Sequence, residues 1–347
     1  MEHILNLIND NNWTAAIKNI KNLFDSINGG KNLFHYACMR GESKVINHFV
    51  SLSSNLIFLS DDDGNTGAHL LAINGWDNLL IDLLRDIPMF LQLKNNDDKF
   101  IFNLVFSRYE TLEKIIDLML LSGHAEYLNY VNNKNQNLIL NIIDTISDNT
   151  TPYFKILIKL SEIQTINFNL PKESPPLIVA ISEKKMCIID FLLEKIKNID
   201  VNIKSSNQFT PLTVAIMNNM TDITLKLIDM YADINYGGSE NKFIPLIMSI
   251  KRGQIDIIEK IIQKDNLNYD KADFSLNSPI FYMIHYVNTY REKYNNEPRL
   301  KIILKQMIQK SNLSERNISG VTPLHLLVKY KLWKDFFLKA ISLYTYV

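Results

Sequence analysis

A short motif recurs along this 347-residue chain at a nearly constant interval, and this recurrence limits the possible folds more than any other feature. Its clearest copy is Gly-Val-Thr-Pro-Leu-His-Leu-Leu at 320–327, and a close copy is Phe-Thr-Pro-Leu-Thr-Val-Ala at 209–215. More divergent copies begin at Gly30, Gly64, Phe243 and Ser278. Units that recur every 20 to 50 residues are typical of a solenoid, in which each unit packs against its neighbours.

The interval is measured at the position that histidine holds in the clearest copies. From His35 to His69 the step is 34 residues, and the same step separates Thr213, Ile247 and Phe281. The remaining steps are 34, 37, 38, 35 and 44 residues. The register therefore predicts nine units, whose slot residues are His35, His69, Asn103, Leu140, Ile178, Thr213, Ile247, Phe281 and His325.

Each unit has the same local plan. A polar turn, such as 61–65, comes first, and a Thr-Pro or Ser-Pro pair follows it. This pair favours the start of a helix. The hydroxyl accepts a hydrogen bond from a free backbone N–H, and Pro at the first helical position loses no hydrogen bond. The short apolar helix is expected to stop near glycine, as at Gly41, Gly75 and Gly253. A second helix, as at 255–262, has apolar residues at the helical period and buries them only against neighbouring units.

This plan resembles the ankyrin repeat family, whose signature joins a β-turn, two helices and Thr-Pro-Leu-His-x-Ala in about 33 residues. Tyr-Ala-Asp-Ile-Asn at 231–235 is similar to the family's Gly-Ala-Asp-Val-Asn. The resemblance covers roughly 29–342 and weakens at 98–130 and 135–168, where we expect distorted units. It implies an all-α fold: an ankyrin-repeat solenoid of about nine helix-turn-helix repeats with short β-turn fingers.

The domain organisation follows from the repeat register. Residues 1–28 carry apolar side chains at helical spacing and are expected to form an N-terminal helical cap; residues 29–347 form the array. An insertion near 286–299 contributes three tyrosines, Tyr286, Tyr290 and Tyr294. It is interpreted either as a contact surface, because tyrosine gives area at small entropic cost, or as a longer helix tolerated at the surface.

Charge and cysteine usage limit the partners and the compartment. Lys+Arg and Asp+Glu are both 37, so no bulk charge attracts nucleic acid or membrane, and neither partner is expected. Cys38 and Cys187 have no metal-ligand spacing and are expected to be buried thiols. With no secretory signal and no long apolar segment, we expect a monomer in the cytoplasm, or in the host cytoplasm or nucleus if the source is viral or bacterial.

No residue pattern for catalysis, cofactor binding or metal binding is apparent, so we predict no enzyme activity, no cofactor and no metal. The resemblance assigns the slot histidines to hydrogen bonds between neighbouring turns. The acids at 61–63 and 97–98 are interpreted as solvated turn residues. The cations Lys184, Lys185, Lys251, Arg252 and Lys329 recur at first-helix ends, either as scattered surface charges or as a basic stripe.

The resemblance implies that a partner docks on the concave side, on finger turns and first-helix ends. Trp76 is expected either there or in the core between repeats. The predicted protein-binding residues are Met39, Arg40, Asp62, Asp63, Asn65, Ile73, Asn74, Trp76, Ser107, Arg108, Asn207, Gln208, Met217, Asn218, Lys251, Arg252, Lys329 and Tyr330.

The sequence thus predicts a non-catalytic interaction module or scaffold that binds a partner protein of unknown identity. Alternatives are a structural component of a larger particle, or the targeting arm of an enzyme whose catalytic domain is elsewhere. A bias toward Asn, Ile and Lys suggests an AT-rich genome, and by analogy a viral or bacterial protein that engages host factors.

Overall fold

The computed structural model describes residues 2–20, 22, 25–52 and 54–332, and its regular backbone there is helical. Two isolated bridges, Asn28 with Lys31 and Lys94 with Phe100, are the only β pairings within these ranges. The chain divides into two compact units, Met1–Asn167 and Phe168–Val347, which are described separately.

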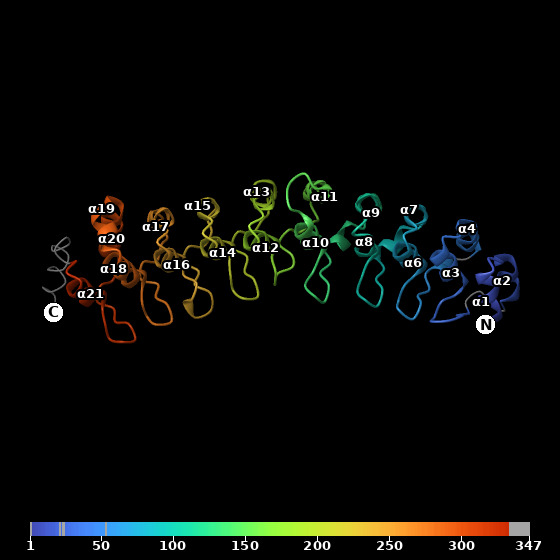
Figure 1. Cartoon of the computed structure of the whole chain (residues 1–347), viewed down its shortest axis with the longest axis horizontal. Helices are drawn as coiled ribbons and strands as arrows, with labels where there is room; N and C mark the ends of the chain where they lie inside the picture. The colour runs from blue at the N-terminus through green and yellow to red at the C-terminus, as the bar shows by residue number, and fades with distance from the viewer. Residues whose placement is uncertain (1, 21, 23–24, 53, 333–347) are drawn as a thin grey trace. The chain divides into compact units, whose positions relative to one another are not determined.

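The N-terminal unit stacks helix pairs in two layers, with a loop projecting beyond each inner helix as a finger (Figure 1). The inner helix α6 packs against the neighbouring inner helices α3 and α8 and against its own outer helix α7. The helices of this unit are α1 (Glu2–Asn9), α2 (Trp13–Asn19), α3 (Leu33–Arg40), α4 (Ser43–Leu52), α5 (Ser54–Ile57), α6 (Gly67–Asn74), α7 (Asp77–Asp86), η1 (Pro88–Gln92), α8 (Ile101–Leu104), α9 (Tyr109–Leu121), η2 (Ala125–Asn129), α10 (Leu138–Thr145) and α11 (Pro152–Ser161).

The C-terminal unit repeats the same two layers. The inner helices α14, α16, α18 and α21 pack in succession, and α15, α17 and α20 form the outer layer. The helices of this unit are α12 (Pro176–Ser182), α13 (Met186–Lys195), α14 (Pro211–Met217), α15 (Thr221–Asp229), η3 (Ser239–Asn241), α16 (Pro245–Arg252), α17 (Ile255–Ile262), α18 (Pro279–Thr289), α19 (Arg291–Asn296), α20 (Pro298–Lys310) and α21 (Pro323–Lys329).

The predicted register is confirmed at the start of every inner helix. Each of the nine slot residues is the third residue of a helix, from His35 in α3 to His325 in α21. Thr322 caps α21 with its hydroxyl, which accepts the His325 N–H at 3.2 Å, and Pro323 follows at the first helical position. The second helix expected in the ninth unit falls on residues 333–347, which lie outside the described ranges.

Glycines end several inner helices where the sequence predicts it. Gly41, Gly75 and Gly253 adopt φ of 69°, 78° and 66°, the left-handed region that closes a helix. A side chain at Gly41 would also collide with the Trp76 ring, 2.5 Å from the ideal Cβ. This glycine is therefore required both by its backbone conformation and by the approach of the next repeat.

The two units where the resemblance weakens still keep the helix pair. Helix α8 has four residues, compared with eight in α6, whereas α10 keeps eight. Asn103 occupies the slot of α8 and its Oδ1 accepts the Phe100 N–H at 3.0 Å, so an amide replaces the imidazole as N-terminal cap. In the first of these two units, the expected distortion takes the form of a shortened inner helix, α8.

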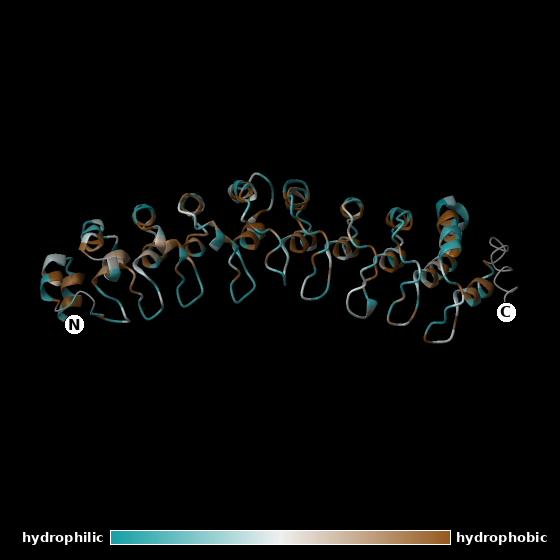
Figure 2. Ribbon diagram, turned by 180° about the vertical axis from the view of Figure 1, so that it is seen from behind, coloured by the Kyte–Doolittle hydropathy of each residue, from teal (hydrophilic) through white to brown (hydrophobic). Residues whose placement is uncertain are grey.

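The core lies between the inner and outer helices of each unit. In α17 the buried side chains are Ile255, Ile257, Ile258, Ile261 and Ile262, which is the predicted helical pattern. In Figure 2 the helices carry most of the hydrophobic colour, while many finger turns are hydrophilic. Each isoleucine or leucine side chain buried this way contributes about 1.5–3 kcal/mol relative to exposure.

The insertion near 286–299 lengthens the inner helix and adds a short one. Helix α18 has 11 residues where α16 has eight, and α19 then turns the chain into the 13-residue outer helix α20. Tyr294 is buried, Tyr286 is partly exposed and Tyr290 is 52% exposed. One tyrosine of the insertion thus packs inside and two remain at the surface.

Candidate protein-binding surface

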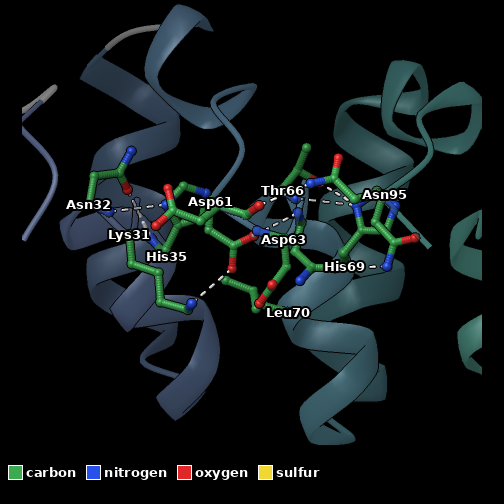
Figure 3. Close-up of polar contacts among 12 residues, drawn as sticks. Lys31, Asn32, His35, Asp61, Asp63, Thr66, His69, Leu70 and Asn95 are labelled. Carbon is green, nitrogen blue, oxygen red and sulfur yellow. Dashed lines mark hydrogen bonds and ion pairs between the residues drawn. The ribbon is translucent and has the colours of Figure 1, made fainter. Parts of the chain in front are cut away.

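The slot histidine His35 links its helix to a neighbouring turn, as the resemblance implies for this position. The His35 Nδ1 accepts the Asn32 N–H at 3.1 Å, and its Nε2 donates to the Leu59 carbonyl at 2.9 Å (Figure 3). Burial lowers the pKa of His35, although the hydrogen bond to the Leu59 carbonyl acts to raise it. Since one ring nitrogen accepts and the other donates, this geometry requires the neutral imidazole.

A carboxylate or amide at the first position of most fingers shapes the turn. The Asp61 Oδ1 accepts the N–H groups of Asp63 at 3.1 Å and Asn65 at 2.8 Å, and Lys31 lies 3.0 Å from Oδ2. The same pair of bonds recurs at Asn95, Asn132, Asp273 and Asn317.

This role corrects one interpretation of the turn acids. Asp61 is buried, not solvated. Burial would raise its pKa, but the Asn65 N–H and the Lys31 ammonium outweigh that effect and lower it. Asp61 is therefore a structural anion, while its neighbours Asp62 and Asp63 are exposed, as predicted.

Adjacent fingers are joined by hydrogen bonds. The Asp62 N–H donates to the Gly29 carbonyl at 3.2 Å, and the Asn96 N–H donates to the Asp63 carbonyl at 3.0 Å. Asn65 is only 7% exposed, and its Oδ1 accepts the Asn95 side-chain amide at 3.0 Å. Of the predicted fingertip contacts, Asn65 therefore offers little accessible area to a partner.

The inner-helix ends carry side chains that bond to the preceding repeat. Arg108 Nη2 donates to the Ala72 carbonyl at 2.6 Å while its Nε pairs with Asp77 at 2.9 Å. Asn218 Nδ2 donates to the Ile181 carbonyl at 3.1 Å, and Arg40 Nη2 to Asn9 Oδ1 at 2.7 Å. These three predicted binding residues also hold neighbouring repeats together.

Trp76 lies neither in the core nor free in solution. It is 41% exposed, its Nε1 donates to the Met39 carbonyl at 3.0 Å, and its ring covers Gly41. One ring face therefore packs on the preceding repeat and the rest stays accessible. An aromatic ring held this way presents area at little further entropic cost.

The remaining predicted residues divide by exposure. Gln208 is partly covered, and its Oε1 accepts the Tyr236 hydroxyl at 2.7 Å. Ile73 and Met217 are exposed apolar side chains, at 50% and 38%. Met39 and Tyr330 are partly exposed, and the exposed polar or charged residues are Asn74, Ser107, Asn207, Lys251, Arg252 and Lys329. We define the inner-helix end surface of each unit separately: Met39, Ile73 and Trp76 in the first unit, and Met217, Lys251, Arg252, Lys329 and Tyr330 in the second.

Sequence reasoning missed two bonds that also join repeats at this surface. Gln254 Nε2 donates to the Ile216 carbonyl at 3.1 Å, and the Tyr153 hydroxyl donates to the Phe106 carbonyl at 2.6 Å. Gln254 stands seven residues after its slot residue Ile247, as Trp76 does after His69. For Gln254, this shared offset from the slot residue is the sequence signal that indicates a contact with the preceding repeat.

The cysteines differ from each other. Cys38 is buried and burial raises the pKa of its thiol well above the usual range, whereas Cys187 is partly exposed, contrary to the expectation that both are buried.

Over the described ranges, no group of three His, Cys, Asp or Glu side chains is placed to hold a metal ion. In the same ranges, no helix has the length and apolar character needed to cross a membrane.

Comparison with known proteins identifies the repeats. A family model described as ankyrin repeats (3 copies) matches residues 142–238 and 177–273. A stretch of 67 residues is 42% identical to Alpha-latrocrustotoxin-Lt1a of Latrodectus tredecimguttatus; it makes up 19% of this chain and spans 5% of that protein.

Two solved structures are similar to this chain, and the first of them shares its fold. An ankyrin repeat protein from Leishmania major is similar with a TM-score of 0.55 at 12% identity, over 80% of this chain and 96% of that one. A crystal structure of another ankyrin repeat protein covers 57% of this chain and 92% of its own, with a TM-score of 0.42 at 16% identity. The family match therefore identifies ankyrin repeats at residues 142–273, and the repeat register and the shared fold give the chain an ankyrin-repeat fold.

Proposed function

We propose that this chain is a non-catalytic module that binds a partner protein through the inner-helix end surface of each unit. Ankyrin repeats are generally protein–protein interaction modules, because stacked repeats present an extended surface without needing a catalytic centre. The observation that carries the proposal is the set of accessible apolar and aromatic side chains at inner-helix ends. Ile73, Trp76 and Met217 are exposed there although the same helices bury their other apolar residues.

The exposed side chains at this surface have the composition of a binding site. Trp, Met and Arg are enriched where proteins contact each other, and a few such residues carry most of the binding energy. Trp76 is also held in place by its bond to Met39, so little conformational entropy is lost when a partner covers it. The finger acids Asp62 and Asp63 extend the surface with polar groups suited to its rim.

Affinity purification tests the proposal. The purified chain is used as bait in lysates of the native source and of its host, and bound proteins are identified by mass spectrometry. A variant with Ile73→Glu and Met217→Glu places two charges in the proposed interface. We expect it to lose the specific partner, because a buried unpaired carboxylate costs several kcal/mol.

A matched control uses apolar residues that are exposed elsewhere. Leu121→Glu and Ile302→Glu alter side chains that are 84% and 64% exposed on or beside outer helices. The control is expected to retain the partner. Equal loss in both variants, or capture unaffected by the Ile73 and Met217 changes, would refute this surface, and a chain that captures no specific partner would refute the function.

A further inference from the structure

The inner-helix ends of the last repeats join into one surface of cations and aromatic rings. At the α16–α18 junction, Lys251 Nζ lies 4.2 Å from the centre of the Tyr282 ring. Tyr286 packs against Gly253, where an added Cβ would come within 2.8 Å of the tyrosine hydroxyl. The rings of Tyr286 and Tyr290 are 4.8 Å apart, which continues the aromatic surface into the insertion.

The surface continues from α18 to α21. The rings of His285 and Tyr330 meet edge to face at 5.5 Å, and the Tyr330 hydroxyl lies 3.2 Å from His285 Nδ1. Arg291 Nη1 donates to the Tyr330 carbonyl at 2.7 Å. Burial and, secondarily, the nearby Lys329 ammonium lower the pKa of His285. We call this set, from Lys251 to Lys331, the basic–aromatic surface.

Its cations have no carboxylate partner among the residues that the structure describes. No carboxylate of a described residue lies within 4.0 Å of the side-chain nitrogens of Lys251, Arg252, Arg291, Lys329 or Lys331, all of which are exposed. Lys293 pairs with Glu297 at 4.0 Å, and Glu292 is the exposed carboxylate in the same segment. Cations therefore outnumber anions on this surface.

Several cations on the outer helices of the same unit are paired with carboxylates. Lys226 pairs with Asp190 and Glu194, and Lys260 with Asp229 at 2.7 Å. Arg299 reaches Asp256 and Glu259, each at 2.6 Å. Among the described residues of this unit, these three outer-helix cations are paired, whereas Lys251, Arg252, Arg291, Lys329 and Lys331 are not. Gathered like charges repel each other, so this arrangement is favourable when an external anion neutralises them.

We propose that the basic–aromatic surface binds an acidic segment of the partner protein. Carboxylates of that segment lie against Lys251, Arg252 and Lys329, and an apolar side chain of the segment packs on Tyr286 and Tyr290. This inference rests on the proposed function and specifies the chemistry of the partner. A protein segment fits better than nucleic acid, because a few local cations beside the Tyr286–Tyr290 pair suit a few carboxylates and an apolar side chain. The whole chain has 37 cations and 37 anions, so it lacks the bulk positive charge that typically binds a phosphate backbone.

Fluorescence anisotropy with a defined probe tests the inference. The probe is a short fluorescein-labelled peptide of Asp and Glu with a few Leu residues; a matched peptide replaces the acids by Asn and Gln. We expect the folded chain to bind the acidic peptide and not the neutral one, more tightly at low salt than at physiological salt. The triple variant Lys251→Gln, Arg252→Gln, Lys329→Gln is expected to bind it about tenfold more weakly, as three exposed charge pairs are lost.

The control variant changes the same net charge elsewhere. Lys44→Gln, Lys114→Gln and Lys305→Gln alter exposed lysines on outer helices, and binding is expected to stay within about twofold of the unmodified chain. Circular dichroism verifies that both variants are folded. No binding of the acidic peptide, or equal weakening in both variants, would overturn the inference.

A labelled single-stranded DNA is measured in parallel. If DNA binding depends on the three cations and peptide binding does not, the surface recognises nucleic acid and the inference is wrong. The proposed function is judged separately, because partner capture that survives the triple variant but fails with Ile73→Glu and Met217→Glu supports the function and rejects only the acidic segment.

Discussion

Lowering the pH from 7 to 5 is expected to destabilise the repeat that contains His69 by about 2 kcal/mol through this one side chain. His69 is fully buried, and its Nδ1 lies 2.8 Å from the Thr66 hydroxyl and 3.3 Å from the Thr66 backbone nitrogen. Burial lowers its pKa from 6.5 to about 4, although the backbone carbonyls of Lys99 and Leu93 act in the opposite direction.

The sign follows from which state binds the proton. Between pH 6.5 and 4 the unfolded chain protonates this imidazole and the folded chain does not. The stability that neutral His69 contributes is therefore fully present above pH 6.5 and is lost as the pH falls toward 4. At about 1.36 kcal/mol per pKa unit, the loss reaches about 2 kcal/mol at pH 5 and about 3 kcal/mol at pH 4.

Urea unfolding at pH 7 and pH 5, for the unmodified chain and for His69→Asn, measures this loss. Asparagine is a suitable replacement because Asn103 fills the same slot and caps its helix. His35, whose pKa is also lowered by burial, remains in both proteins and cancels in the difference. The stability gap between the two proteins should change by about 2 kcal/mol between the two pH values. A gap that does not change with pH, or a His69 resonance that titrates near 6.5, would refute the reasoning.

Two further substitutions test the finger and the helix end. Asp61→Ala removes the acceptor of two backbone N–H groups and the partner of Lys31. In a denaturant titration it should lower the free energy of unfolding by about 2–4 kcal/mol. Asp63→Ala, at an exposed position, should lower it by less than about 0.5 kcal/mol in the same titration. Comparable costs would contradict the structural role of Asp61. Gly41→Ala should lower the free energy of unfolding more than Gly123→Ala does, because both glycines have positive φ but only Gly41 faces the Trp76 ring. Equal losses of stability in the two variants, with unchanged tryptophan fluorescence, would contradict this close contact.

The fold could be predicted from the sequence because its main determinants are local and recur. The slot residues, the Thr-Pro caps and Gly41, Gly75 and Gly253 each act within one turn of helix, so their spacing alone places the inner helices. Where His is replaced, Asn103 and Thr213 form the same bond to the preceding cap residue. The local chemistry therefore persists where the motif itself has been lost.

The position that shapes the fingers was also present in the sequence. Asp61, Asn95, Asn132, Asp273 and Asn317 each stand eight residues before a slot residue. Aligning the units on the slot and comparing the residues at that offset would have found them. Their place in a polar turn favours solvated acids, and this expectation is wrong for Asp61, which is buried.

The candidate binding residues were harder to predict because exposure depends on the neighbouring repeat. Arg40, Arg108 and Asn218 all stand five residues after a slot residue, yet each reaches a different group of the preceding repeat. Trp76 covers Gly41 and stays accessible only because glycine leaves room for its ring. Cys187 is partly exposed although it lies in an apolar helix. Such contacts between repeats are not encoded in the pattern of one unit.

Hydroxyl-radical footprinting of the chain with and without its captured partner tests the central claim most directly. The side chains of Ile73, Trp76 and Met217 are exposed in the free chain, and those of Leu121 and Ile302 serve as internal references. Binding through the inner-helix end surface of each unit predicts that oxidation of the first three falls when the partner is bound, while oxidation of the two references is unchanged. Protection of Leu121 and Ile302 with unchanged oxidation of Trp76 would contradict it.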